Sequence, residues 1–586
     1  MATDASSLPR SVLGWGPHLW NRVLFPGEAD TRTRVRPLSL LFVLLLPAIL
    51  LYPTRAFYLL EPDEGRYAQI PKEMVEGGSW VVPTLQGEPY LDKPPLMYWL
   101  VAISYEIFGV SEASARLVPA LCVHLTILAI YLLGRRSIGE RGAFWAALLL
   151  TVAPGFLGVA RLLLLDGLLT LCVTMSVLCG FEAVRSGTLN RRWWIAAAVM
   201  SGLGFLTKGP ISEVLLFPPL LLFAWLQSQR SLSPFAPRKD ELSPGLPMPE
   251  LGEVGEPTFR GAKGDHGALG LWKWCKAHAK DAALFAGIVV LVNSPWYVAM
   301  LLREPQFLKH FFWEHNVMRF AKPFDHLEPI WYYAPIFLGG FLPGVLLAVP
   351  YLRSLLFGGT EEAQGRSAAG GFWLLSGLWC LFFFSLSGSK LPTYILPAFP
   401  PLCLALGEFV ARSRWDRSLF PRGVVAAFAV LLLAVNYAVL PWYAKVRSPM
   451  GRPEMVRRYL NDPNVTVVTY PRNVDSVAFY MDRKDLKAVR SKDVNQMIVD
   501  SHFRPKTVIL FTHEHSLRGF EETLAGAKGS SLRITETKSF RHNSANWLDK
   551  MIGGTPWGLC DIAVVEPSAE YVKDRRAKGI AMRGGD

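Results

Sequence analysis

The chain has 586 residues, of which 51% are hydrophobic, and its mean hydropathy is +0.25. The apolar residues are concentrated in long runs, which excludes an ordinary soluble enzyme of this size. The formal net charge is +13, but the basic residues are spread between the apolar runs rather than gathered in one polar patch, so we expect no nucleic-acid partner. The composition therefore indicates a protein embedded in a lipid bilayer.

Eleven apolar runs have the length that a helix needs to cross a hydrocarbon core of roughly 30 Å. They cover residues 38–57, 116–134, 142–160, 167–185, 193–207, 210–228, 281–302, 332–354, 371–388, 391–411 and 423–441. One or two further spans are expected near residues 94–110, which are apolar but few. The sequence therefore predicts a mostly α-helical, polytopic membrane protein with about 11 to 13 transmembrane helices.

The orientation of these spans follows from the charges between them. The first run follows a basic leader, residues 1–37, and the bulky residues 50–53 offer no small-residue cleavage site, so we interpret it as a retained anchor. A cytoplasmic amino terminus places most short-loop arginines in the cytoplasm, as the positive-inside rule requires. These are Arg135, Arg136, Arg141, Arg185, Arg191, Arg192, Arg412, Arg414 and Arg417. The same orientation places an outer loop, residues 58–115, on the opposite side.

Two further segments differ from the spans in composition. The insert at residues 228–280 is rich in Pro, Gly and charge, which predicts a disordered cytoplasmic loop within a transmembrane domain over residues 38–445. The tail, residues 446–586, contains strand-like runs that alternate with helical stretches: 465–470, 486–490, 507–512 and 532–537. The tail is therefore predicted to be a small extracytoplasmic α/β domain.

The outer loop opens with the string Glu61-Pro-Asp-Glu-Gly-Arg-Tyr67. Asp63 and Arg66 are three residues apart, so on a helix they share one face. A carboxylate there can orient an acceptor hydroxyl or phosphate, and a guanidinium can hold an anionic leaving group. The alternative is a helix cap with a surface ion pair, which is at least as common for such a string.

A second string, Tyr90-Leu-Asp92-Lys93-Pro-Pro, places a lysine before two prolines that impose an extended backbone. Lys93 either extends its charged end to the membrane surface or binds a lipid phosphate.

Further ionisable residues lie at the predicted outer ends of spans. These residues are Asp166, Lys208 in the string Thr-Lys-Gly-Pro, and Lys390 with Tyr394 four residues after it. The outer loop that precedes Lys390 holds His315 and Arg319. A histidine in such a loop is more often an ordinary polar residue than a metal ligand. The cations gather on the side that positive-inside orientation leaves poor in them, which points to a phosphate-bearing lipid. No Walker loop, dinucleotide-binding glycine motif or His-Glu-x-x-His string is present, so neither a nucleotide-driven motor nor a zinc protease is indicated.

Taken together, these strings resemble the motifs of bacterial aminoarabinose (lipid A) transferases. That family belongs with the protein O-mannosyltransferase-like enzymes of the GT-C superfamily. The resemblance runs in order from Leu38 to Pro401 and rests on these strings: 63–67, 93–95 with 98–99, 160–166, 207–210, 314–316 with 319–320, and 390–394.

The resemblance implies an inverting glycosyltransferase of the bacterial inner membrane, with its active site and carboxyl terminus in the periplasm. Such an enzyme moves aminoarabinose, or another pentose or hexose, from undecaprenyl phosphate to lipid A or to another periplasmic acceptor, a protein or glycan. Two alternatives stay open, a protein O-mannosyltransferase and a polyprenyl-lipid flippase. A transporter predicts ionisable groups at mid-membrane, whereas here they lie at the ends of spans.

The resemblance also assigns roles to residues. It implies that Asp63 is catalytic, and we place Asp166 with it. The predicted contacts to the carrier phosphate are Arg66, Tyr90, Lys93, Lys208, Arg319, Lys390 and Tyr394. The family further implies a divalent metal ion, zinc or a similar one, for which Asp92 and His315 are the candidate ligands.

Overall fold

The structure is a computed structural model that describes most of the chain. The described residues are 34–231, 278–318, 327–357, 367–448, 450, 453–462, 465–483, 485–513, 515–527, 531–539 and 560–578. The predicted leader and the predicted cytoplasmic insert therefore lie almost entirely outside the described residues.

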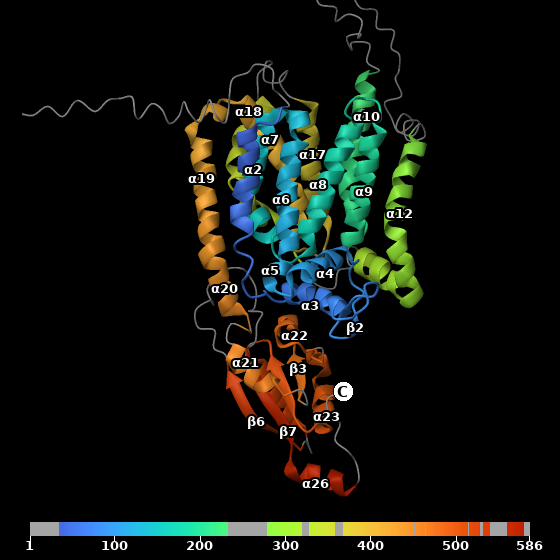
Figure 1. Ribbon diagram of the computed structural model, residues 1–586, viewed down its shortest axis with the longest axis vertical. Helices are drawn as coiled ribbons and strands as arrows, with labels where there is room; N and C mark the ends of the chain where they lie inside the picture. The colour runs from blue at the N-terminus through green and yellow to red at the C-terminus, as the bar shows by residue number, and fades with distance from the viewer. Residues whose placement is uncertain are drawn as a thin grey trace, which may run out of the picture.

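A bundle of long helices forms the larger part of the molecule (Figure 1). Each of the eleven predicted runs contains a helix, and only the run at 332–354 is broken sharply. The helices of the bundle are α2 (Pro37–Leu51), α6 (Leu117–Leu132), α7 (Arg135–Thr151), α8 (Leu165–Val184), α9 (Arg191–Lys208), α10 (Ile211–Ser231), α12 (Ala279–Arg303), α17 (Ala368–Leu386), α18 (Phe399–Arg412), α19 (Leu419–Ala434) and α20 (Leu440–Arg447). Shorter helical segments join them: η1 (Gly155–Val159), η3 (Lys309–Met318), η5 (Pro392–Ala398), η6 (Arg414–Arg417) and η7 (Val435–Val439).

Within the described part of the chain, six helices are long and apolar enough to cross a membrane. A bent helix pair makes a seventh candidate span, and three shorter apolar helices accompany them: Pro37–Leu51, Leu96–Phe108 and Ile211–Gln227. These helices are mostly uncharged over lengths that match a bilayer core. The chain is a multi-pass membrane protein, as its hydropathy predicts.

The span predicted at 332–354 is broken rather than formed by one straight helix. Helix α14 (Tyr333–Gly340) and the following η4 (Gly344–Leu347) and α15 (Ala348–Phe357) meet at an angle of 96°. Pro343 lies in the break, and a proline removes a helical hydrogen-bond donor. Gly340 also packs against η1, since a Cβ at Gly155 would lie 2.8 Å from the Cα of Gly340.

A layer of short elements separates the bundle from the C-terminal domain (Figure 1). It contains α3 (Asp63–Val75), the hairpin β1 (Thr84–Leu85) and β2 (Glu88–Pro89), α4 (Leu96–Phe108) and α5 (Glu112–Ala115). The apolar segment expected near 94–110 is α4, which packs against α3 through buried residues such as Met97 and Tyr105. The Tyr105 hydroxyl donates a hydrogen bond to the carbonyl of Ala68 at 3.2 Å. The predicted outer loop is therefore folded into a layer of short helices and a hairpin.

The C-terminal domain is built on a five-stranded sheet with the order β4-β3-β5-β7-β6. Strands β3 (Thr466–Tyr470), β4 (Lys487–Ala488) and β5 (Thr507–Phe511) are parallel, while β7 (Asp561–Pro567) is antiparallel to β5 and to β6 (Leu532–Ser539). The described helical elements of the domain are α21 (Pro453–Leu460), α22 (Asp475–Met481), η9 (Ser491–Asp493), α23 (Val494–His502), α24 (Ser516–Gly526) and α26 (Ala569–Ala577).

Strands β3 and β5 are fully buried, because apolar clusters cover the two faces of the sheet. The four strands predicted from the sequence are present, and β7 is a fifth that the prediction missed. Helix α22 lies on the side of the sheet that faces α3 (Figure 1). The domain therefore rests on the same layer that carries the motifs of the outer loop.

Candidate active site

Helix α3 presents the first motif. Asp63 and Glu64 occupy its first turn, where carboxylates interact favourably with the helix dipole. As the spacing predicts, Asp63 and Arg66 lie on one face, with 3.8 Å between Asp63 Oδ1 and Arg66 Nη1. The Arg66 guanidinium also lies 5.9 Å from the centre of the Tyr90 ring, within the range of a cation–π contact. The Asp63 side chain is 42% exposed and therefore open to an acceptor.

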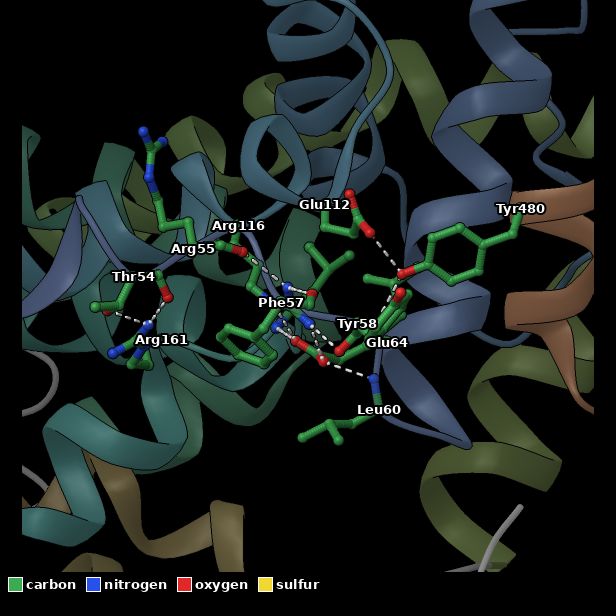
Figure 2. Close-up of polar contacts among 12 residues, drawn as sticks. Thr54, Arg55, Phe57, Tyr58, Leu60, Glu64, Glu112, Arg116, Arg161 and Tyr480 are labelled. Carbon is green, nitrogen blue, oxygen red and sulfur yellow. Dashed lines mark hydrogen bonds and ion pairs between the residues drawn. The ribbon is translucent and has the colours of Figure 1, made fainter. Parts of the chain in front are cut away.

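A buried ion pair that the sequence prediction missed holds α3 in place (Figure 2). Arg116, at the start of α6, donates to both carboxylate oxygens of Glu64, from Nε at 2.9 Å and from Nη2 at 2.7 Å. It also donates to the backbone carbonyls of Arg55, Phe57 and Tyr58. The exposed fractions of the two side chains are 1% for Arg116 and 2% for Glu64. A charge at the first turn of an apolar span was the sequence signal for Arg116.

Glu64 also ties α3 to the segment that leads into α8. Its carboxylate accepts hydrogen bonds from the backbone N–H of Leu60 at 2.9 Å and of Leu163 at 2.8 Å. Burial disfavours the charged carboxylate, but Arg116 and these N–H donors outweigh that effect and hold the pKa of Glu64 below its ordinary value. Glu64 therefore fixes the backbone next to Asp63 and the backbone three residues before Asp166.

The second cluster joins three predicted residues that are far apart in the sequence. Lys208, in the last turn of α9, donates to Asp166 Oδ1 in the first turn of α8 at 2.6 Å. The ammonium group of Lys208 also lies 4.4 Å from the centre of the Tyr394 ring, which belongs to η5. The structure therefore brings together an acid, a cation and an aromatic ring from three of the motifs.

The other predicted cations are placed differently. Lys390 is buried and donates to the backbone carbonyls of Glu328, at 2.8 Å, and of Ser387, so it stabilises the turn after α17 in this state. Lys93 is half-buried in the extended segment between β2 and α4. Arg319 lies outside the described residues.

The proposed metal ligands are only partly brought together. Asp92 Oδ1 lies 3.1 Å from Nε2 of His310, a histidine that the sequence prediction passed over in favour of His315. The side chain of His315 is outside the described part of the chain. Nδ1 of His310 pairs with Glu314 at 3.0 Å, so the two carboxylates approach opposite edges of the ring. Among the described residues, no three His, Cys, Asp or Glu side chains converge on a common point, and the residues present do not by themselves complete a metal site.

A buried carboxylate from the C-terminal domain also reaches this site. Asp475, the first residue of α22, lies with Oδ2 at 3.5 Å from Arg66 Nε. Its sequence neighbourhood carries no motif, and the contact joins residues that are more than four hundred positions apart, so no local pattern was able to reveal it.

Comparison with known proteins places this arrangement in a family. Residues 92–237 match the family model described as dolichyl-phosphate-mannose-protein mannosyltransferase. An undecaprenyl phosphate-alpha-4-amino-4-deoxy-L-arabinose arabinosyl transferase of Pseudomonas savastanoi pv. phaseolicola is 31% identical over 430 residues, which cover 71% of this chain and 70% of the relative. One of Pseudomonas fluorescens is 32% identical, over 72% of this chain and 66% of the relative.

The structural comparison agrees with these matches. The crystal structure of ArnT from Cupriavidus metallidurans bound to undecaprenyl phosphate matches this chain with a TM-score of 0.63 and 20% sequence identity. The match covers 92% of this chain and 99% of the ArnT chain. The chain spans slightly less than two thirds of the length of the first curated relatives it matches, 65% and 66%. Because the relatives match over most of their length and the fold agrees, the chain belongs to the family of undecaprenyl phosphate-aminoarabinose arabinosyl transferases.

Proposed function

We propose that this chain is an inverting glycosyltransferase that moves 4-amino-4-deoxy-L-arabinose from undecaprenyl phosphate to lipid A. One observation carries the proposal: the structure contains two acid–cation pairs, Asp63 with Arg66 and Asp166 with Lys208. Glu64 connects the segments that carry the two acids, because its carboxylate accepts a hydrogen bond from the Leu163 N–H. The sugar and the carrier are those in the names of these relatives. Undecaprenyl phosphate is the ligand named for the Cupriavidus metallidurans structure, which has the same fold.

The proposed chemistry is a single displacement. An oxygen of the lipid A phosphate attacks the anomeric carbon of the sugar, and the bond from that carbon to the carrier phosphate oxygen breaks with inversion. The electron pair of the broken bond leaves on undecaprenyl phosphate. Arg66, Lys93 and Lys208 would stabilise the charge that develops there, which is usually the largest catalytic effect. Asp63 would orient the acceptor, or take its proton if the acceptor is a hydroxyl group.

The side of the membrane is also part of the proposal. Helix α6 begins beside the α3 layer and therefore ends at the opposite end of the bundle (Figure 1). The arginine-rich segments after α6, α8 and α18 thus lie away from α3, and positive-inside orientation assigns them to the cytoplasm. The candidate site and the C-terminal domain would then be periplasmic.

The divalent metal remains a proposal without a complete ligand set. Asp92 and His310 would supply two of its ligands, and no step above depends on it. Elemental analysis of the purified, dialysed protein and of its Asp92→Ala variant tests it. Stoichiometric metal that is lost in the variant supports the site, and a metal-free active protein contradicts it.

The function is tested by giving the purified full-length chain a choice of acceptors. We expect aminoarabinose transfer from its undecaprenyl-phosphate donor to lipid A, detected by mass spectrometry as a sugar added to a lipid A phosphate. Because residues 92–237 also match the mannosyltransferase model, a periplasmic protein extract with a mannosyl donor is the competing reaction. Transfer to protein without transfer to lipid A would contradict the proposal.

A further inference from the structure

Within the described part of the C-terminal domain, the short helix α22 contacts the candidate site. A Cβ at Gly65 of α3 would lie 2.5 Å from the backbone nitrogen of Ser476, so only glycine allows this approach. The Ser476 N–H donates to Glu61 Oε1 at 2.7 Å. Helices α3 and α22 therefore touch backbone to backbone directly beside Arg66.

Three further contacts join α22 and the residue after it to this layer. The Tyr480 hydroxyl accepts from the Leu59 N–H at 2.9 Å and donates to Glu112 at 2.8 Å (Figure 2). On the other side, Lys72 Nζ lies 2.8 Å from Asp482 Oδ1. The backbone contact at Ser476, near the start of α22, and the contacts of Tyr480, near its end, hold the helix in one register on the outer-loop layer.

This docking of α22 places Asp475 at the candidate site. Its side chain is 1% exposed, and its Oδ1 accepts from Gln86 Nε2 at 2.9 Å and from the Asn473 amide. Its Oδ2 accepts no hydrogen bond among the described residues and lies toward Arg66 Nε. Burying a carboxylate is costly unless a cation compensates it, and Arg66 is the cation that Asp475 meets.

The geometry at Arg66 suits a group that must bind a second anion. Asp475 approaches the Nε edge at 3.5 Å, and Asp63 lies 3.8 Å from Nη1. Both separations exceed the roughly 2.7–2.9 Å of a charge-assisted hydrogen bond. The two carboxylates therefore orient the guanidinium without saturating its terminal nitrogens, and the Tyr90 ring flanks it.

We propose that Asp475 is a positioning residue of the transferase site: the C-terminal domain holds Arg66 by its Nε edge so that the terminal nitrogens meet the carrier phosphate. This inference rests on the proposed function, because it assumes that Arg66 binds that phosphate. If Asp475 has this role, the C-terminal domain contributes a residue to the active site.

The test is a double-mutant cycle on the full-length protein with undecaprenyl phosphate as the probe. Asp475→Asn keeps the shape of the side chain and its acceptor for Gln86, but it removes the charge that faces Arg66. We expect its affinity for undecaprenyl phosphate to fall about tenfold, with a rise in KM for the donor that exceeds the fall in kcat. In an Arg66→Gln background the same substitution should change affinity less than about twofold.

Asp482→Asn is the matched control, since it removes the other carboxylate by which α22 contacts α3. Asp482 has φ 55°, a left-handed conformation that asparagine also adopts, so the backbone is retained. Because the Asp482 side chain is 75% exposed, its ion pair with Lys72 contributes little to the docking, and this variant should bind the probe like the wild type. If Asp475→Asn does not yield folded protein, Gln86→Met removes the amide donor to Asp475 and should lower affinity in the same direction, again only when Arg66 is present.

The outcomes separate the inference from the function. An affinity loss that is equal in the Arg66→Gln background, or no loss while Arg66→Gln itself binds weakly, would overturn the role of Asp475 and leave the proposed function standing. Failure of the wild type to bind undecaprenyl phosphate would overturn both.

Discussion

Removing Arg116 should destabilise the protein more than any exposed charge substitution in the same layer. In Arg116→Met, Glu64 stays buried without its cation, which typically costs about 3–5 kcal/mol of unfolding free energy. The carbonyls of Arg55, Phe57 and Tyr58 lose a donor as well, at about 1 kcal/mol each. The sum, about 6–8 kcal/mol, is comparable with the whole stability of many domains.

The assay is thermal unfolding of the purified protein in one detergent, followed by monodispersity in size-exclusion chromatography. We expect the Tm of Arg116→Met to fall by about 10 °C or more, or the variant to yield no monodisperse protein. Arg55→Met is the control: Arg55 is half-buried and donates to the backbone carbonyls of Tyr52 and Ala113. Its Tm should fall by a few degrees at most. Equal Tm values for the two variants would refute the reasoning.

Two further predictions concern the same layer. Lys93→Ala removes a cation that would meet the carrier phosphate before and during transfer, so both the affinity for undecaprenyl phosphate and the turnover should fall. The loss in binding free energy should be about 1.5–3 kcal/mol, as measured by titration beside a transfer assay. Unchanged binding and turnover would show that Lys93 is not part of the site. Burial and the neighbouring Asp475 raise the pKa of Glu61 from 4.5 to about 8, so the folded state holds a proton that the unfolded state releases. The contribution of Glu61 to stability is therefore fully present below about pH 4.5 and is lost as the pH rises toward 8. Tm measured across this range should fall more, or rise less, with pH in the wild type than in Glu61→Gln, and equal slopes would contradict the assignment.

Hydropathy was sufficient for the bundle because membrane spans are selected by local composition and length. All the predicted runs therefore contain helices. The break at 332–354 has a local cause, since Pro343 interrupts a segment whose apolar character is continuous. Strand β7 was missed because the short run at 561–567 carries little periodicity of its own and becomes a strand by pairing with β5 and β6.

The candidate site was predictable only where a motif carried it. Asp63 and Arg66 lie on one turn of helix, so their spacing was enough to place them together. The contact of Lys208 with Asp166 depends on how α8 and α9 pack, and that of Asp475 with Arg66 depends on how a separate domain docks. His310 was passed over because the spacing of the third loop did not show which histidine faces Asp92.

The central claim is that Asp63 acts in sugar transfer while the cations around it bind the carrier. The most direct measurement compares wild type and Asp63→Asn, both monodisperse, in a lipid A transfer assay and an undecaprenyl phosphate titration run side by side. Because asparagine retains the shape but loses the charge, transfer should fall by about two orders of magnitude or more while carrier affinity stays within about twofold of the wild type. Transfer at the wild-type rate by Asp63→Asn would contradict the account.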